Sequence, residues 1–181
     1  MRKLHLCCIF LLLQTGFCCA QTIIGIATRW SDAFSEWVIY TDQEDIDGEL
    51  SLRWPNDNNW TEWRYRIGEE AGTIRVKWPG DPNEWELRGG NRVITMRTVW
   101  NNDRRHWRIS TRQIFTMRSR YGNTWNEWLL ERSTTGTFDI IAVWENDPRD
   151  WKVYDNLDAS VDVSTKIAML FVAIFNSVPK W

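Results

Sequence analysis

The chain has 181 residues, a formal net charge of −2 and 43% hydrophobic residues, which is typical of a globular protein and not of a disordered one. So small a net charge gives no general reason to expect nucleic acid or an anionic lipid surface as a partner. All four cysteines lie within the first twenty residues, so the remaining chain has no thiol nucleophile and no Cys/His zinc ligand set. We therefore predict no metal, no cofactor and no nucleic-acid partner.

Residues 1–20 have the pattern of a secretory signal peptide. Arg2 and Lys3 supply the positive start, an apolar stretch follows from Leu4 to Leu13, and small residues precede Gln21. The apolar stretch is too short to span a membrane, so no transmembrane segment is predicted. Lipid anchoring through a cysteine is the weaker alternative, because neither Cys18 nor Cys19 follows a small residue. Cleavage would leave a secreted or periplasmic protein of one domain.

The remaining chain contains an internal repeat of six units. In each unit a large aromatic residue is followed, usually seven positions later, by a tryptophan, and thirteen of the fourteen tryptophans fall inside these windows. The leading aromatics are 24, 24, 22, 21 and 23 residues apart. The windows are Trp30–Trp37, Trp54–Trp63, Trp78–Trp85, Trp100–Trp107, Tyr121–Trp128 and Trp144–Trp151.

Alternation of apolar and polar residues on both sides of each window predicts two half-buried strands per unit. In the third unit Ile74, Val76 and Trp78 alternate with basic residues, and Trp85 and Leu87 alternate with charged ones. Six such hairpins give about twelve strands. We predict an all-β fold over residues 21–157, a curved or closed meander barrel in which both aromatics of each window lie in the core. A β-trefoil is the alternative, although a trefoil alternates two kinds of hairpin and these six are alike.

The segment between the paired aromatics resembles a helix start in most units. Asp81-Pro82-Asn83-Glu84 has an N-cap residue, a proline at the first helical position and a glutamate at the third, and Asp147 to Asp150 is similar. This pattern predicts one capped helical turn in each loop. Residues 158–181 differ, because Ile167 to Phe175 is almost wholly apolar. We expect a helix that starts near Ser164 or Thr165 and is buried in the same domain; a buried strand is the alternative.

The loop acids and the single histidine of residues 21–181 are the residues with catalytic chemistry. Two carboxylates about 5–10 Å apart could hydrolyse a glycosidic bond, yet the acids recur in every unit, whereas a catalytic pair should occur once. His106 stands where other units have an acid, and no nucleophile signature accompanies it. We therefore predict that the protein is not an enzyme and that these residues cap loops, with a carboxylate-based glycoside hydrolase as the alternative.

Aromatic side chains at the first position of the predicted turn are not required by the strand pattern. Flat rings with polar neighbours suit a sugar ring or a protein hot spot, so we predict a ligand-binding site formed by Phe34, Trp60, Arg104 and Trp125. The competing interpretation is that these rings fold back over adjacent hairpins, since tryptophan is usually well buried.

Arginines recur on the polar strand faces and predict either cross-strand ion pairs with acids such as Glu86 and Glu131 or a positive stripe for an acidic glycan or phosphate. Taken together, the sequence predicts an exported, non-catalytic binding or scaffold protein whose loops engage a glycan or a protein. A structural role in an envelope assembly is the remaining alternative.

Overall fold

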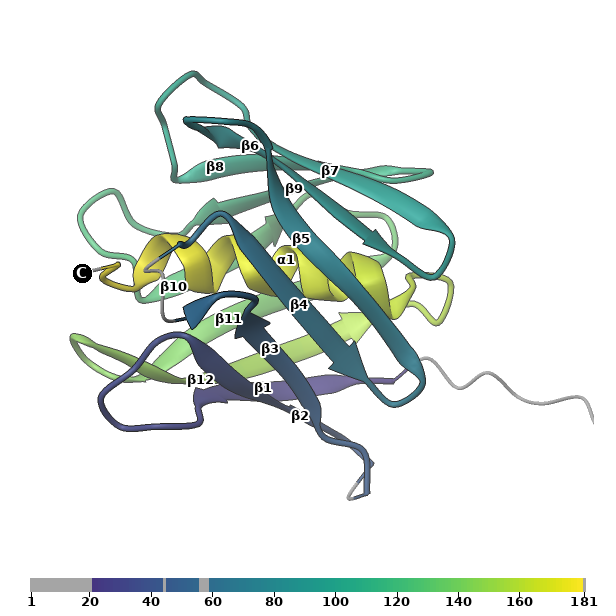
Figure 1. Cartoon of the computed structure of the whole chain (residues 1–181). Coiled ribbons are helices and arrows are strands. Elements are labelled where there is room, and N and C mark those ends of the chain that lie inside the picture. Colours follow the sequence, from purple (N-terminus) through teal and green to yellow (C-terminus); the bar gives the residue numbers. More distant parts are fainter. Residues whose placement is uncertain (1–20, 44, 56–58, 181) are drawn as a thin grey trace, which may run out of the picture.

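The computed structural model describes residues 21–43, 45–55 and 59–180. The predicted signal peptide, residues 1–20, lies outside the described residues. The described chain forms a closed antiparallel barrel of twelve strands with a C-terminal helix, which confirms the predicted fold class (Figure 1). The elements are β1 (Ile23–Thr28), β2 (Glu36–Thr41), β3 (Gly48–Leu52), β4 (Glu62–Ile67), β5 (Glu70–Trp78), β6 (Asp81–Gly89), β7 (Arg92–Thr98), β8 (His106–Ser110), β9 (Ile114–Ser119), β10 (Glu127–Glu131), β11 (Gly136–Trp144), β12 (Asp147–Leu157) and α1 (Val163–Ser177).

Each strand pairs with its neighbours in the sequence, and β1 closes the barrel against β12, so the topology is a meander and not a trefoil. The six predicted hairpins run from β1–β2 to β11–β12. Their loops gather at one end of the barrel, here named the tip-loop end, and the links between hairpins gather at the other, named the connector end. The twelve-strand sheet therefore leaves no edge strand, which a flat sheet of this size would expose.

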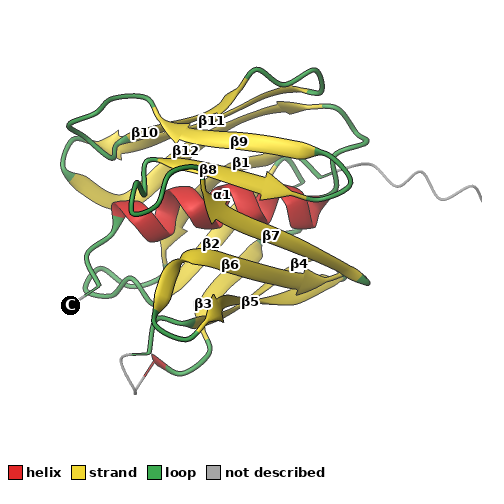
Figure 2. Ribbon diagram, turned by 90° about the horizontal axis from the view of Figure 1, so that it is seen from above, coloured by secondary structure: helices red, strands yellow, loops and turns green. Residues whose placement is uncertain are grey.

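Helix α1 occupies the interior of the barrel and runs from the connector end to the tip-loop end (Figure 2). Its residues from Ser164 to Phe175 are all buried, as expected for a helix that is apolar on every side. The predicted caps Ser164 and Thr165 are wrong. Asp162 is the N-cap residue, because its carboxylate accepts a hydrogen bond from the Thr165 amide at 2.9 Å. No helix in the described part of the chain is long and apolar enough to cross a membrane.

The core lies between the inner face of the sheet and α1. The tryptophan that ends each window is buried here with at most 2% of its surface exposed. Trp85 packs against Phe171 and Phe175 of the helix, with ring centroids 5.0 and 4.6 Å apart. Burying six indoles around one helix supplies much of the apolar area that a barrel of this width needs to fill its interior.

The leading aromatic of every window is exposed, so the prediction that it lies in the core is wrong. The residue directly opposite each buried tryptophan is the one two positions before the leading aromatic: Thr28, Leu52, Val76, Thr98, Ser119 and Ala142. These side chains are smaller than an indole and leave room for it. The leading aromatic lies two residues farther along, either after the strand has ended or, for Trp78 and Trp144, beyond a register shift at the end of the strand.

The predicted helical turns are also wrong, although the capping residues do bind backbone amides. In three units Asp81, Asp103 and Asp147 each accept a hydrogen bond from the amide two residues later, at 2.9–3.1 Å. Asn59 does the same for Thr61. This i to i+2 contact is an Asx turn, which leads the chain into a strand instead of a helix.

A buried ion pair joins α1 to the barrel wall. The Lys166 ammonium lies 2.7 Å from the Asp155 carboxylate, and their side chains are 2% and 0% exposed. Lys166 also donates to the backbone carbonyl of Gln21 at 2.9 Å, while Asp155 accepts from the Ile23 amide at 3.0 Å. The pair thus ties the helix, β12 and the start of β1 together at the connector end.

A second polar cluster lies at the start of α1. The hydroxyls of Tyr65 and Ser164 are hydrogen bonded at 2.9 Å, and Ser164 also donates to Glu70. The Tyr65 ring sits so close to Gly72 and Gly89 that a Cβ atom at either position would overlap it. Glycine at these two positions therefore makes room for the tyrosine beside the helix.

Burial raises the pKa of the Tyr65 hydroxyl from 10.0 to about 12. Because the folded protein holds this proton more tightly than the unfolded chain, the stabilisation is complete below pH 10 and is lost as the pH rises through 12. We expect this group to lower the free energy of unfolding by on the order of 2 kcal/mol across that range. Urea unfolding at several alkaline pH values should show that the free energy of unfolding falls less steeply with pH in Tyr65→Phe than in the intact protein. Equal slopes in the two proteins would contradict the assignment.

Candidate functional site

The tip loops are held by one contact that recurs in all six hairpins. Each buried tryptophan donates its indole N–H to the backbone carbonyl of the residue three positions earlier, at 2.7–3.2 Å. The acceptors are Phe34, Trp60, Pro82, Arg104, Trp125 and Pro148. This bond satisfies the polar atom of a buried indole and fixes the loop above it. It explains why the repeat uses tryptophan here and not a purely apolar residue.

The four residues of the predicted binding site all belong to these loops at the tip-loop end. Phe34, Trp60 and Trp125 are half-buried and pack against the core. Their rings lie 6.2, 5.6 and 5.8 Å from the buried tryptophan of the same hairpin. Arg104 is half-buried as well. These contacts support the interpretation that the three rings fold back over the hairpins, and the three rings are here named the floor.

The six leading aromatics form a second, outer set, here named the aromatic rim. They expose between 48% and 66% of their surface and follow the barrel circumference at the tip-loop end. Neighbouring members belong to hairpins two strands apart, which places them roughly 10 Å from one another if strands lie about 4.8 Å apart. The members are Trp30, Trp54, Trp78, Trp100, Tyr121 and Trp144.

Ion pairs support four of the six rim residues. The residue just before the aromatic is basic in these units and pairs with the glutamate that directly precedes the buried tryptophan: Arg29 with Glu36, Arg53 with Glu62, Lys77 with Glu84 and Arg120 with Glu127. Two of these acids also accept the indole N–H of the rim residue, Trp30 and Trp78, at 3.2 and 3.1 Å. The recurring acids thus hold the rim in place.

Units four and six have valine before the aromatic and lack this ion pair. His106 takes the place of the acid in unit four, and its ring nitrogen lies 3.2 Å from the carboxylate of Glu131, which Arg118 also binds at 2.9 Å. A structural partner therefore accounts for the histidine as well as for the four glutamates.

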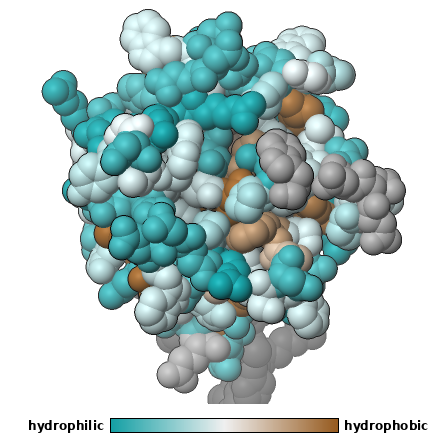
Figure 3. Space-filling view, turned by 90° about the vertical axis from the view of Figure 1, so that its left-hand side faces the viewer, coloured by the Kyte–Doolittle hydropathy of each residue, from teal (hydrophilic) through white to brown (hydrophobic). Residues whose placement is uncertain are grey.

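The C-terminal end of α1 closes the middle of the tip-loop end, onto which Figure 3 looks. The Ser177 hydroxyl donates to the Trp125 carbonyl and accepts from the Trp128 indole, both at 3.0 Å. The Lys180 ammonium lies 4.1 Å from the centroid of the Phe175 ring. Burial, together with the charge of Arg104, lowers the pKa of Lys180 from 10.5 to about 8. Hydrophobic side chains gather toward the middle of this face, with hydrophilic ones around them (Figure 3).

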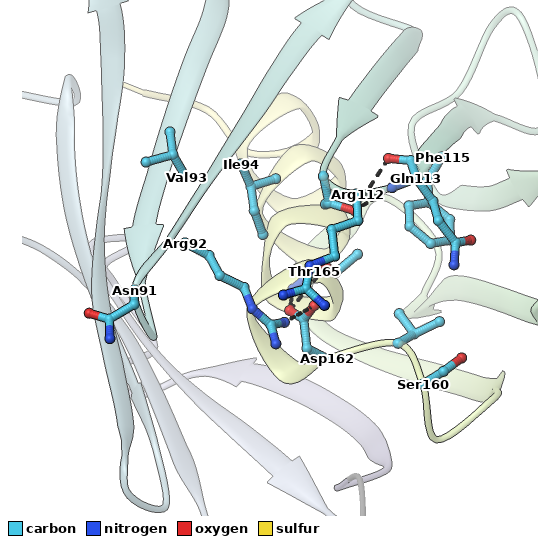
Figure 4. Close-up of a pocket in the computed structure, with 12 residues that line it drawn as sticks. Asn91, Arg92, Val93, Ile94, Arg112, Gln113, Phe115, Ser160, Asp162 and Thr165 are labelled. Atoms are coloured by element: carbon cyan, nitrogen blue, oxygen red, sulfur yellow. Dashed lines mark hydrogen bonds and ion pairs between the residues drawn. The ribbon is translucent and has the colours of Figure 1, made fainter.

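A pocket of about 530 Å³ opens at the connector end, between the β6–β7 turn, the β8–β9 turn and the segment before α1 (Figure 4). Its wall includes the ion pair between Arg92 and Asp162, and Asp162 is already engaged as the N-cap of α1. Arg112 extends over the pocket from the β8–β9 turn. Of the charged groups of this pocket, Arg92 and Asp162 are therefore already engaged at the start of α1.

Comparisons with protein-family models, curated proteins and solved structures find no match for this chain.

Sequence reasoning missed the rim, because it placed the leading aromatics in the core. One signal in the sequence points to it. The residue directly before the leading aromatic is basic in the four units that carry glutamate directly before the buried tryptophan, and these residues form ion pairs beside the rim.

Proposed function

We propose that this is an exported, non-catalytic glycan-binding protein whose aromatic rim holds sugar rings at the tip-loop end. The observation that carries the proposal is the exposure of a large aromatic at the same position of all six hairpins. Core packing does not require these rings, because smaller residues face the buried tryptophans. An exposed indole offers a flat face with negative potential, against which the C–H groups of a sugar ring pack favourably.

The distribution of the rim favours a glycan over a protein partner. Hot spots of protein interfaces cluster near the centre of a contiguous patch. The rim aromatics instead lie on separate hairpins, and several contact charged side chains, as Trp54 contacts Arg53 and Trp78 contacts Lys77 and Glu84. Separate stacking platforms with hydrogen-bonding neighbours suit the repeating units of a polysaccharide. The ion pairs of the recurring acids support a non-catalytic role.

A glycan array compares the intact protein with the double variant Trp78→Ala/Trp100→Ala. We expect affinity for the bound glycan to fall at least about tenfold, equivalent to about 1.4 kcal/mol, while the melting temperature changes little, because both side chains are exposed. Tyr154→Ala is the matched control, since it removes an aromatic that is 44% exposed on the barrel wall, away from the rim. Equal loss in the control would contradict a role specific to the rim.

The residues predicted from the sequence are tested by Trp60→Ala/Trp125→Ala in the same array. If the ligand contacts the floor as well as the rim, this variant also loses affinity. Capture of a protein through rim residues, with no glycan bound, would overturn the proposal. Turnover of a bound sugar that is abolished by replacing one acidic pair would overturn its non-catalytic part.

A further inference from the structure

The charge of the chain is concentrated in one sector of the barrel. Residues 91–121, which form β7, β8 and β9 with their loops, contain eight arginines, no lysine and one acidic residue, Asp103. Their net charge is +7, whereas residues 21–181 as a whole carry −4, with 20 basic and 24 acidic residues. The rest of that range therefore carries −11. A mildly acidic protein thus has one strongly basic sector.

Four of the eight arginines in this sector have partners. Arg92 pairs with Asp162, Arg118 with Glu131 and Arg120 with Glu127. Arg105 donates to backbone carbonyls of the next tip loop and lies 3.9 Å from the centroid of the Trp125 ring. The guanidinium groups of the other four make no hydrogen bond or ion pair within the described residues: Arg97, Arg104, Arg108 and Arg112.

Arg97 and Arg108 lie directly opposite each other on β7 and β8, and both are exposed. On the other side of Arg97 the facing residue is Glu84, whose two carboxylate oxygens already bind Lys77 and the Trp78 indole. Beyond Arg108 the facing residue is the uncharged Thr116. Like charges directly across a strand pair lower the stability of a sheet. The fold therefore carries a destabilising arginine pair that the described structure does not neutralise.

We propose that this arginine pair is part of a binding site for an acidic polysaccharide, whose carboxylate or sulfate groups neutralise it. This rests on the proposed function and names the chemical class of the glycan. Arg104 precedes β8 and Arg112 follows it, so the four unpaired arginines extend along the hairpin from its tip loop to the β8–β9 turn. Trp100, of the same hairpin, brings the aromatic rim to one end of this span.

An extended polyanion of sugar units fits this arrangement better than a single small anion. The four arginines are spread along the hairpin and are not gathered into one pocket. A planar guanidinium binds a carboxylate or sulfate through two parallel hydrogen bonds, which an exposed arginine is free to make. The acidic remainder of the barrel repels a polyanion, so binding is confined to the β7–β9 sector.

Isothermal titration tests this with polygalacturonate and with the same polymer after its carboxyl groups have been reduced to neutral galactose. We expect the acidic form to bind and to weaken as salt is raised, and Arg97→Gln/Arg108→Gln to bind it about tenfold more weakly. The matched control is Arg66→Gln/Arg132→Gln, which removes two exposed, unpaired arginines outside the sector and should retain affinity. The melting temperature of the Arg97/Arg108 variant should equal or exceed that of the intact protein.

The outcomes separate this inference from the proposed function. Equal binding of the acidic and reduced polymers, unaffected by the arginine variant but lost in Trp78→Ala/Trp100→Ala, overturns the inference and leaves the proposed function standing. Absence of binding to any glycan on the array overturns both. Tighter binding of a single-stranded oligonucleotide than of polygalacturonate at equal salt, dependent on Arg97 and Arg108, overturns the assignment to a polysaccharide.

Discussion

Replacing Asp155 with asparagine is expected to lower the free energy of unfolding by about 3–5 kcal/mol, because it leaves the Lys166 ammonium buried without its counter-ion. The two side chains lie 2.7 Å apart and are 0% and 2% exposed, so water cannot take the place of the lost charge. Asp155 also accepts the amides of Ile23 and Leu157, at 3.0 and 3.2 Å, and thereby holds the point where β1 closes against β12. Urea unfolding followed by tryptophan fluorescence measures the loss.

A double-mutant cycle separates the interaction between the two charges from the packing changes that each substitution causes by itself. Lys166→Met alone leaves Asp155 charged and buried, whereas Asp155→Asn/Lys166→Met removes both charges and should recover part of the stability. Lys77→Met is the matched control, because Lys77 makes an ion pair of similar length, 2.8 Å to Glu84, with a side chain that is 33% exposed. Breaking that pair should cost no more than about 1 kcal/mol. A loss for Asp155→Asn no larger than that for Lys77→Met would contradict a structural role for the buried pair.

The sequence was sufficient to predict the barrel because every unit repeats the same period-two pattern on two strands. Alternation such as Ile74-Val76 before the turn and Trp85-Leu87 after it specifies one buried face. Six similar hairpins pair most simply with their neighbours in sequence order. Closing the sheet into a barrel then leaves no unpaired edge strand. The wholly apolar stretch after Ile167 required burial on all sides, and the barrel interior supplies it.

The position of the leading aromatics could not be obtained from alternation alone. Trp78 has the parity of a core residue, but regular pairing between β5 and β6 ends after Val76 and Trp85, and the register shifts there. A register shift changes which face a side chain takes. The alternation rule assumes that a strand stays regular up to its last residue. It therefore predicted that the rim aromatics lie in the core.

The predicted helix caps were correct in one respect and wrong in another: the residues bind backbone amides, but they do not start helical turns. Asp81 does bind a backbone amide, as a cap would, but it binds the amide two residues on and is the first residue of a strand. A cap residue and an Asx turn use the same carboxylate, and the tertiary context of the flanking strands decides between them. The ion pair between Asp155 and Lys166 was not foreseen, because its partners are far apart in the chain and no local pattern links them.

Within a single hairpin, Trp85→Ala is expected to lower the free energy of unfolding by about 3–5 kcal/mol, whereas Trp78→Ala should change it by no more than about 0.5 kcal/mol. The two residues are seven positions apart and identical in type, but Trp85 is 2% exposed and Trp78 is 56% exposed. Loss of the Trp85 indole leaves a cavity beside Phe171 and Phe175, which the closed barrel cannot collapse to fill. Equal effects of the two substitutions, measured by urea unfolding, would refute the division of the repeat into core and rim.

Trp85→Phe separates the two contributions of the buried indole. Phenylalanine keeps most of the contact with α1 but lacks the N–H that donates to the Pro82 carbonyl at 3.0 Å. The loss of that bond should cost about 1 kcal/mol, in addition to a smaller packing term. Because the bond fixes the tip loop, hydrogen exchange of the amides of Gly80, Asp81, Asn83 and Glu84 should accelerate in Trp85→Phe more than exchange in β5 does. Uniform acceleration across the hairpin would show instead that the indole acts through packing alone, and that the contact repeated in all six loops is incidental to their order.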